Sequence, residues 1–253
     1  MDIVQSFYND LARDYDKLFQ DWDSSINEQA VILDKLFKDN KIDKTSNILD
    51  CACGIGTQTI GLGKLGYNIT ASDVSVNAIE EAKLRAQKNN LNVEFKVADF
   101  RALEKTFSTK FNAVIAMDNA LPHALTKSDL TLAVKSIVST LKPNGVFIAS
   151  IRDYDEILKE KPTLTKPYVH KTEKGQRISF QTWMWKGENY NLIQYIIEDE
   201  DNLKISKFEC EYRATTKGEL SSLFTSLGCT ATWKFESETG FYQPIIIAKK
   251  QEV

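Results

Sequence analysis

The sequence lacks a long hydrophobic run, because no stretch of its 253 residues approaches the roughly twenty consecutive apolar residues that a membrane-spanning helix needs. Its first six residues also lack the basic and apolar regions of a secretory signal peptide. These absences exclude an integral membrane protein and argue against secretion. We therefore expect a cytoplasmic protein with no membrane partner.

Side chains that bind metals are scarce, since the sequence has only two histidines and four cysteines. Cys51 and Cys53 form a C-x-C pair, but no C-x-x-C pair is present. Zinc sites and redox-active cysteine pairs commonly use that longer spacing. We therefore predict no metal site, and packing roles beside a strand for Cys51 and Cys53.

The chain also lacks an excess of basic residues, because 35 aspartates and glutamates outnumber 32 lysines and arginines. A broad phosphate-binding surface needs clustered Lys and Arg, so we expect no nucleic-acid partner. Hydrophobic residues make up 42% of the chain, as in ordinary globular proteins. This length suits one large α/β domain with a full core, and we predict a single domain over residues 1–253.

Most of the chain alternates between apolar segments typical of strands and amphipathic segments typical of helices. Seven strands are predicted, at residues 47–50, 67–73, 93–97, 111–117, 146–151, 230–235 and 244–248. Helices are predicted between them, with Ser75, Ser128 and Thr216 as N-caps. This order predicts an α/β fold with a Rossmann-like, doubly wound, mostly parallel sheet.

Two segments stand outside this alternation. Residues 1–40 carry an apolar helical face that is interrupted around Asp21 to Ser25, which predicts two helices over the entrance of the sheet. Residues 165–214 read as strands at 177–185, 190–197 and 204–212. They predict a three-stranded antiparallel insertion that acts as a lid.

The most informative motif is the turn that follows the first strand. Asp50 ends that strand, and Gly54 and Gly56 follow in a tight turn. Glycines there let backbone N–H groups approach a bound nucleoside. Asp73 ends the next strand, where such folds place the carboxylate that binds ribose hydroxyls.

Two ligands are compatible with this turn, a dinucleotide such as NAD and S-adenosylmethionine. Thr59 stands where a dinucleotide fingerprint has its third glycine. A pyrophosphate would bring negative charge close to Asp50, whereas S-adenosylmethionine brings an α-ammonium group that this carboxylate attracts. The local chemistry therefore favours S-adenosylmethionine as the cofactor, with NAD as the alternative.

Further strand ends complete a set of motifs. In sequence order the set is Asp50-Cys-Ala-Cys-Gly-Ile-Gly, Asp73, Ala98-Asp99-Phe100 and the apolar strand Phe111 to Met117. From about Ile48 to Ala248, the chain resembles class I S-adenosylmethionine-dependent methyltransferases. A narrower resemblance, to glycine and glycine/sarcosine N-methyltransferases, is carried by Ile48 to Gly56, Ala116 to His123 and Arg152 to Leu158.

The resemblance implies a seven-stranded sheet whose last strand is antiparallel, and it implies a cofactor site. The cofactor-binding candidates are Asp50, Ala52, Gly54, Gly56, Asp73, Asp99, Phe100 and Met117. Tyr15 and Trp22 are added as rings that could face the sulfonium. Animal members of the narrower group hold the cofactor carboxylate with an arginine on the N-terminal helices. No arginine lies between Trp22 and Phe37 here, which leaves the partner of the cofactor carboxylate unassigned, with Gln29 as a guess.

The resemblance also implies an acceptor site at the exits of two strands. Arg152 matches the arginine that holds the acceptor carboxylate in the narrower group, and Asn119 and His123 lie on the neighbouring strand exit. These three are the candidate catalytic residues, because methyl transfer from a sulfonium depends mainly on aligning the nucleophile. The candidates for the walls of the acceptor site are Tyr154, Tyr168 and Tyr212.

Structural roles are open for the same residues. Arg152 can instead pair with Asp153 or Asp155 on the surface. His123 follows Pro122 and can cap a turn through its ring nitrogen.

These observations predict a methyltransferase that acts on the nitrogen of a small carboxylate-bearing molecule, with glycine or sarcosine as the first acceptors to test. One alternative is a methyltransferase for another small metabolite with a nitrogen or oxygen acceptor. Another is a binding module that keeps the cofactor site without turnover. The only partner predicted is a small-molecule substrate, and assembly into a homo-oligomer is left open.

Overall fold

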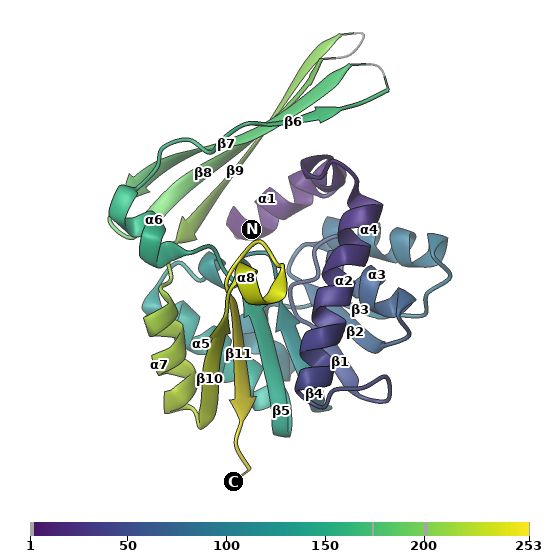
Figure 1. The fold of residues 1–253 in the computed structure, drawn as a ribbon, viewed down its shortest axis with the longest axis vertical. Coiled ribbons are helices and arrows are strands. Elements are labelled where there is room, and N and C mark those ends of the chain that lie inside the picture. Colours follow the sequence, from purple (N-terminus) through teal and green to yellow (C-terminus); the bar gives the residue numbers. More distant parts are fainter. Residues whose placement is uncertain (1–2, 174, 200–201, 253) are drawn as a thin grey trace.

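Seven strands form one twisted sheet in the order β10-β11-β5-β4-β1-β2-β3 (Figure 1). The computed structural model describes residues 3–173, 175–199 and 202–252. The strands of this sheet are β1 (Asn47–Asp50), β2 (Asn68–Asp73), β3 (Glu94–Val97), β4 (Phe111–Ala116), β5 (Leu141–Ser150), β10 (Cys229–Lys234) and β11 (Ile245–Lys250). Strands β1 to β5 pair in parallel, and β11 pairs antiparallel with both β5 and β10. The predicted mostly parallel sheet with an antiparallel last strand is confirmed.

Helices cover both faces of this sheet, as a doubly wound fold requires. The helical segments are α1 (Ile3–Leu11), η1 (Tyr15–Leu18), α2 (Trp22–Asp39), α3 (Thr57–Lys64), α4 (Val76–Lys88), η2 (Phe100–Lys105), η3 (Leu121–His123), α5 (Lys127–Thr140), α6 (Tyr154–Glu160), α7 (Lys217–Ser226) and α8 (Glu236–Thr239). Ile48 of β1 faces a cluster that includes Phe37 of α2, and its neighbour Leu49 faces a cluster that includes Phe224 of α7. Successive strand residues point to opposite faces, so a sheet covered on both sides needs continuous apolar strands.

The predicted N-caps are confirmed at two of three helices. The side chains of Ser75 and Thr216 accept hydrogen bonds from the backbone N–H groups of Ala78 and Glu219. The prediction of Ser128 was wrong, because the Thr126 side chain caps α5 instead. Thr126 and Ser128 both precede the apolar face, and the sequence pattern alone does not separate them.

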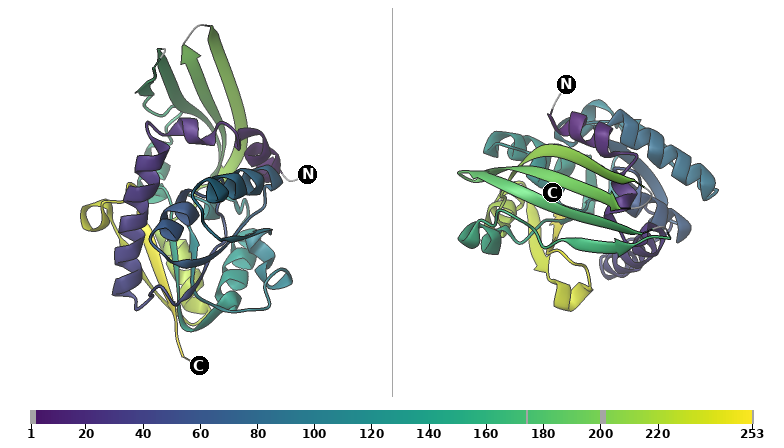
Figure 2. Two further views of the ribbon diagram at one scale, coloured as in Figure 1. Left: turned by 90° about the vertical axis from the view of Figure 1, so that its right-hand side faces the viewer. Right: turned by 90° about the horizontal axis from the view of Figure 1, so that it is seen from above.

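The insertion is a separate antiparallel sheet of four strands, β6 (Tyr168–Lys171), β7 (Gln176–Lys186), β8 (Asn189–Asp199) and β9 (Leu203–Arg213). The three long strands are those predicted, and β6 adds a short edge strand that the sequence analysis missed. This sheet projects above the carboxyl ends of the main sheet, and α1 lies beneath it (Figures 1 and 2). The Nη2 atom of Arg177 donates to the backbone oxygen of Phe19 at 2.6 Å, which ties the insertion to the N-terminal segment.

No described helix combines the length and the apolar character that crossing a membrane requires.

Candidate active site

The glycine turn after β1 is fastened to the end of β2. Gly54 and Gly56 both have positive φ values, 51° and 95°, which favour glycine over other residues. The backbone N–H of Gly54 donates to Oδ2 of Asp73 at 2.9 Å, and the N–H of Ser75 donates to Oδ1 at 2.9 Å. The carboxylate therefore sets the shape of the turn as well as facing the space above it.

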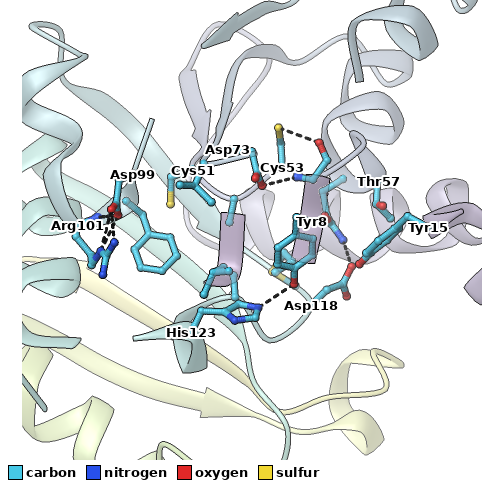
Figure 3. Close-up of a pocket in the computed structure, with 18 residues that line it drawn as sticks. Tyr8, Tyr15, Cys51, Cys53, Thr57, Asp73, Asp99, Arg101, Asp118 and His123 are labelled. Carbon is cyan, nitrogen blue, oxygen red and sulfur yellow. Dashed lines mark hydrogen bonds and ion pairs between the residues drawn. The ribbon is translucent and has the colours of Figure 1, made fainter. Parts of the chain in front are cut away.

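A first cavity lies over this turn (Figure 3). Its walls come from α1, η1, the turns after β1, β2 and β3, and the exit of β4. Asp99 and Arg101 lie at one end, and Asp118 lies at the other, beside Tyr15. The open space is only about 60 Å³, because Tyr8 and Tyr15 project into it (Figure 3).

The structure places most of the predicted cofactor residues in the lining of this cavity. Those that line it are Tyr15, Ala52, Gly54, Asp73, Asp99, Phe100 and Met117. Asp50 lies behind the lining and accepts a hydrogen bond from Thr59 Oγ1 at 2.7 Å. Gly56 also lies outside it and caps α3. Trp22 does not reach the cavity, because its ring packs in the core under the guanidinium of Arg85.

The first cavity is rich in negative charge. Asp73, Asp99 and Asp118 line it, while its one lining arginine, Arg101, pairs with Asp99 at 2.6 Å. Burial raises the pKa of Asp50 to about 7, although the hydrogen bond from Thr59 lowers it in part. Burial also raises the pKa of Asp73 and of Asp118. Such a site suits a ligand with cationic sulfonium and ammonium groups, and it disfavours the pyrophosphate of NAD.

The raised pKa of Asp50 predicts how stability depends on pH. Since the folded value of about 7 exceeds the unfolded value of about 3.9, this group stabilises the fold fully below pH ~4, and the stabilisation is lost as pH rises through about 7. Without ligand, the unfolding free energy of the wild type should therefore fall between pH 5 and pH 8. In Asp50→Asn, which lacks this ionisable group, we expect the fall to be smaller by on the order of 2 kcal/mol. Denaturant titrations at both pH values measure this difference, and equal losses in both proteins would contradict it.

A second, larger cavity of about 750 Å³ lies between the main sheet and the insertion. Tyr8, Tyr15 and Asp118 line both cavities, so the two adjoin. The predicted acceptor residues that line the second cavity are Arg152, Tyr168 and Tyr212. Trp183 and Gln181 of β7 complete the wall around Arg152.

Arg152 carries the main positive charge deep in this second cavity. Its Nη1 donates to Tyr190 Oη at 2.7 Å and its Nη2 to Gln181 Oε1 at 3.1 Å. The guanidinium carbon lies 4.9 Å from the ring centroid of Trp183 and 5.4 Å from that of Tyr212. Among the described residues, no carboxylate lies within ion-pair distance of this guanidinium. A cation held only by neutral groups is suited to an anionic ligand.

The alternative in which Arg152 pairs with its neighbours on the surface was wrong. Asp153 and Asp155 both form ion pairs with Lys217 at the start of α7, and the Asp155 pair is 3.1 Å long. Both carboxylates therefore pair with Lys217 and not with Arg152.

The remaining predicted residues of the acceptor site are Asn119, Tyr154 and His123. Asn119 accepts from the backbone N–H of Arg152 at 3.1 Å and donates to Tyr154 Oη at 3.0 Å. Asn119 and Tyr154 line neither cavity, so the geometry gives them a supporting position. His123 lines the first cavity, where its Nε2 lies 2.9 Å from Tyr8 Oη and its ring centroid 4.1 Å from that of Tyr212.

Several lining residues were missed by the sequence analysis. They are Tyr8, Gln58, Asp118, Gln181 and Tyr242. Asp118 had a signal, because it immediately follows the predicted strand 111–117 at the edge where ligands bind. The other four come from helices, loops or the insertion, and their position depends on tertiary packing. Gln29, the candidate for the cofactor carboxylate, accepts from Gln58 Nε2 at 2.6 Å.

Part of the chain is similar to a known family of protein domains. Residues 48–145 match the family described as methyltransferase domain. The glycine/sarcosine N-methyltransferase of Parasynechococcus marenigrum is 27% identical over 154 residues, which is 61% of this chain and 53% of the relative. The chain thus spans about half the length of this curated relative.

Solved structures share the fold over nearly the whole chain. An S-adenosylmethionine-dependent methyltransferase from Clostridium acetobutylicum superimposes with a TM-score of 0.77 at 18% identity, covering 97% of this chain and 99% of the other. CalS10, an amino pentose methyltransferase from Micromonospora echinaspora solved with S-adenosylmethionine bound, gives 0.74 at 16% identity over 90% and 92% of the two chains. These likenesses confirm the predicted fold.

Proposed function

We propose that this protein transfers the methyl group of S-adenosylmethionine to the nitrogen of a small acceptor bearing a carboxylate. The match of residues 48–145 to a methyltransferase domain and the shared fold of methyltransferase structures support this proposal. The observation that carries the proposal is the guanidinium of Arg152, which lines the larger cavity without an acidic partner among the described residues. Glycine and sarcosine are the first acceptors to test, since they pair an amine with a carboxylate. The similarity to glycine/sarcosine N-methyltransferases supports the same choice.

The chain's own side chains divide the work between the two cavities. When bound, S-adenosylmethionine supplies a methyl carbon activated by a positively charged sulfur. Asp73 would accept hydrogen bonds from the ribose hydroxyls, and Asp99 would hold the adenine at the opposite end from Asp118 (Figure 3). Arg152 would bind the acceptor carboxylate, while the insertion covers the second cavity. Fixing two reactants in this way contributes as much as ~7 to 11 kcal/mol to catalysis.

A larger amine is the second candidate acceptor, and the volume of the second cavity favours it. About 750 Å³ lies in the range of sites that bind drug-sized ligands, and it greatly exceeds what glycine fills. CalS10, which shares the fold, acts on an amino pentose. An anionic amino sugar would use Arg152 and the aromatic rings of Trp183 and Tyr212 as its binding surface.

Ligand-induced stabilisation tests the proposed function. We expect S-adenosylhomocysteine at about 100 times its Kd to raise the melting temperature by roughly 5 to 10 °C, because ligand binding at that level adds about 2.7 kcal/mol. Glycine, sarcosine or a larger anionic amine should then raise it further. Transfer of labelled methyl from S-adenosylmethionine to the same compounds measures turnover. Stabilisation by NADH and none by S-adenosylhomocysteine would reject the proposal.

A further inference from the structure

Asp118 stands where the two cavities meet. Among the described residues it is the one acidic side chain that lines both of them. Its Oδ1 accepts from Tyr242 Oη at 2.7 Å, and its Oδ2 accepts from Gln58 Nε2 at 2.8 Å. Both donors are neutral, and no described Lys, Arg or His lies within ion-pair distance of this carboxylate. Asp118 is therefore a negative charge at the junction with no cation to neutralise it.

The backbone fixes Asp118 beside Arg152. The N–H of Asp118 donates to Ser150 Oγ at 2.8 Å, and the N–H of Asn119 donates to the backbone oxygen of Ser150 at 3.1 Å. The Asn119 side chain in turn accepts from the backbone N–H of Arg152 at 3.1 Å. Asp118 and Asn119 have positive φ values of 54° and 69°, which non-glycine residues rarely adopt. These hydrogen bonds hold the exits of β4 and β5 together. The acidic Asp118 and the basic Arg152 therefore both line the second cavity.

We propose that Asp118 and Arg152 form a two-point site for a zwitterionic acceptor, in which Arg152 binds the carboxylate and Asp118 binds the ammonium group and accepts its proton. This inference rests on the proposed function and adds to it a base that deprotonates the acceptor amine. An amine that arrives as an ammonium ion has no free lone pair until a proton leaves. A carboxylate at the junction can take that proton where the acceptor faces the first cavity.

The proton and the electrons balance in this scheme. An N–H bond of the ammonium breaks, the proton moves to a carboxylate oxygen of Asp118, and the electron pair stays on nitrogen. That pair forms the new N–CH3 bond while the C–S bond breaks and leaves its electrons on sulfur. The product nitrogen carries the positive charge that the sulfur loses, and Asp118 releases its proton to water when product leaves.

The surroundings of Asp118 suit this role. Burial raises the pKa of its carboxyl above the usual range, and the hydrogen bonds from Tyr242 and Gln58 lower it only in part. A raised pKa makes the carboxylate a stronger base. The other ionisable side chains near it are Tyr15, Tyr242 and Asp50. The carboxylate of Asp50 adds negative charge that favours a bound cation.

A set of three probes separates the two contacts. Glycine carries both charged groups, glycinamide keeps the ammonium without the carboxylate, and acetate keeps the carboxylate without the ammonium. Their Kd values are measured by calorimetry near pH 7 with the full chain saturated with S-adenosylhomocysteine, in the wild type, Asp118→Asn and Arg152→Gln. Glu156→Gln is the control, because that side chain is 67% exposed on α6.

The proposal expects a crossed pattern. Asp118→Asn should raise the Kd of glycine and of glycinamide about tenfold or more and leave the Kd of acetate unchanged. Arg152→Gln should raise the Kd of glycine and of acetate and leave the Kd of glycinamide unchanged. With glycine as acceptor, kcat should fall about 10²- to 10⁴-fold in Asp118→Asn, the usual contribution of a positioned base. The control should match the wild type throughout.

Other outcomes would reject either the inference about Asp118 or the proposed function. Suppose that Arg152→Gln weakens the binding of acetate and glycine, but Asp118→Asn changes neither the binding nor the turnover of glycine. In that case the inference fails and the proposed function stands. The inference also fails if Asp118→Asn weakens S-adenosylhomocysteine instead of glycine, since Asp118 would then serve the cofactor. If the wild type neither binds nor methylates any carboxylate-bearing amine, the proposed function fails as well.

Discussion

Replacing Arg152 with glutamine is expected to lower kcat/KM for a carboxylate-bearing acceptor by about 10²- to 10³-fold. Removing one partner of a buried, hydrogen-bonded charge pair costs about 2 to 5 kcal/mol, and each 1.4 kcal/mol is about tenfold. The guanidinium has no acidic partner among the described residues, so the folded protein should lose little stability with the change. Steady-state kinetics with glycine, sarcosine and larger anionic amines measure the effect.

Arg152→Lys should recover only part of this loss. A lysine ammonium keeps the charge, but it cannot span Tyr190 Oη and Gln181 Oε1 with a planar fork or stack in the same way against Trp183. The Kd of S-adenosylhomocysteine should stay within about threefold in both variants. Lys159→Gln is a matched control, since Lys159 is exposed on α6 and pairs with Glu156 there. Unchanged acceptor kinetics in Arg152→Gln would remove Arg152 from the acceptor site.

The main sheet could be predicted because its strands have a strong local signal. Strand β4 is a nearly continuous apolar segment, and the predicted segment 111–117 covers the observed Phe111–Ala116. The short edge strand β6 has no such signal, because it contains four residues and pairs on one side only with β7. Its formation depends on a neighbour that the sequence places several residues later. Local pattern therefore predicts long buried strands better than short edge strands.

The candidate site was predictable at the ends of strands and poorly elsewhere. Gly54, Asp73 and Asp99 lie on turns whose position follows from the strand order, and all three line the first cavity. Trp22 was assigned by residue type alone, and the structure places its ring in the core. Whether an aromatic ring faces a cavity depends on how α2 packs on α3, which the residue type does not determine.

The partners of Arg152 illustrate the same limit. Its sequence neighbours Asp153 and Asp155 are the nearest acids along the chain, but Lys217, more than sixty residues away, takes both of them. Gln181 and Tyr190, which contact the guanidinium, belong to the insertion. An unpaired charge is a property of the folded chain, because it requires knowing every group that comes within reach.

Asp73→Asn is expected to weaken S-adenosylhomocysteine about 100-fold and also to destabilise the turn that contains Gly54. Both carboxylate oxygens of Asp73 already accept backbone N–H groups, from Gly54 and Ser75, each at 2.9 Å. An asparagine has one oxygen and one NH2 group, so a donor would face a donor at one of these contacts. Leaving a buried donor without its partner costs about 1 to 3 kcal/mol, and loss of the charge also removes an acceptor for the ribose hydroxyls.

A distant carboxylate separates loss of binding from loss of stability. Asp34 of α2 accepts from Lys38, Lys44 and Tyr67, contacts that lower its pKa to about 2, and it lines neither cavity. Asp34→Asn should therefore lower the melting temperature and leave the Kd of S-adenosylhomocysteine unchanged. Asp73→Asn should change both, with circular dichroism confirming that the fold is retained. Equal Kd values in Asp73→Asn and the wild type would show that the ribose is held elsewhere, and the first cavity would lose its assignment as the nucleoside site.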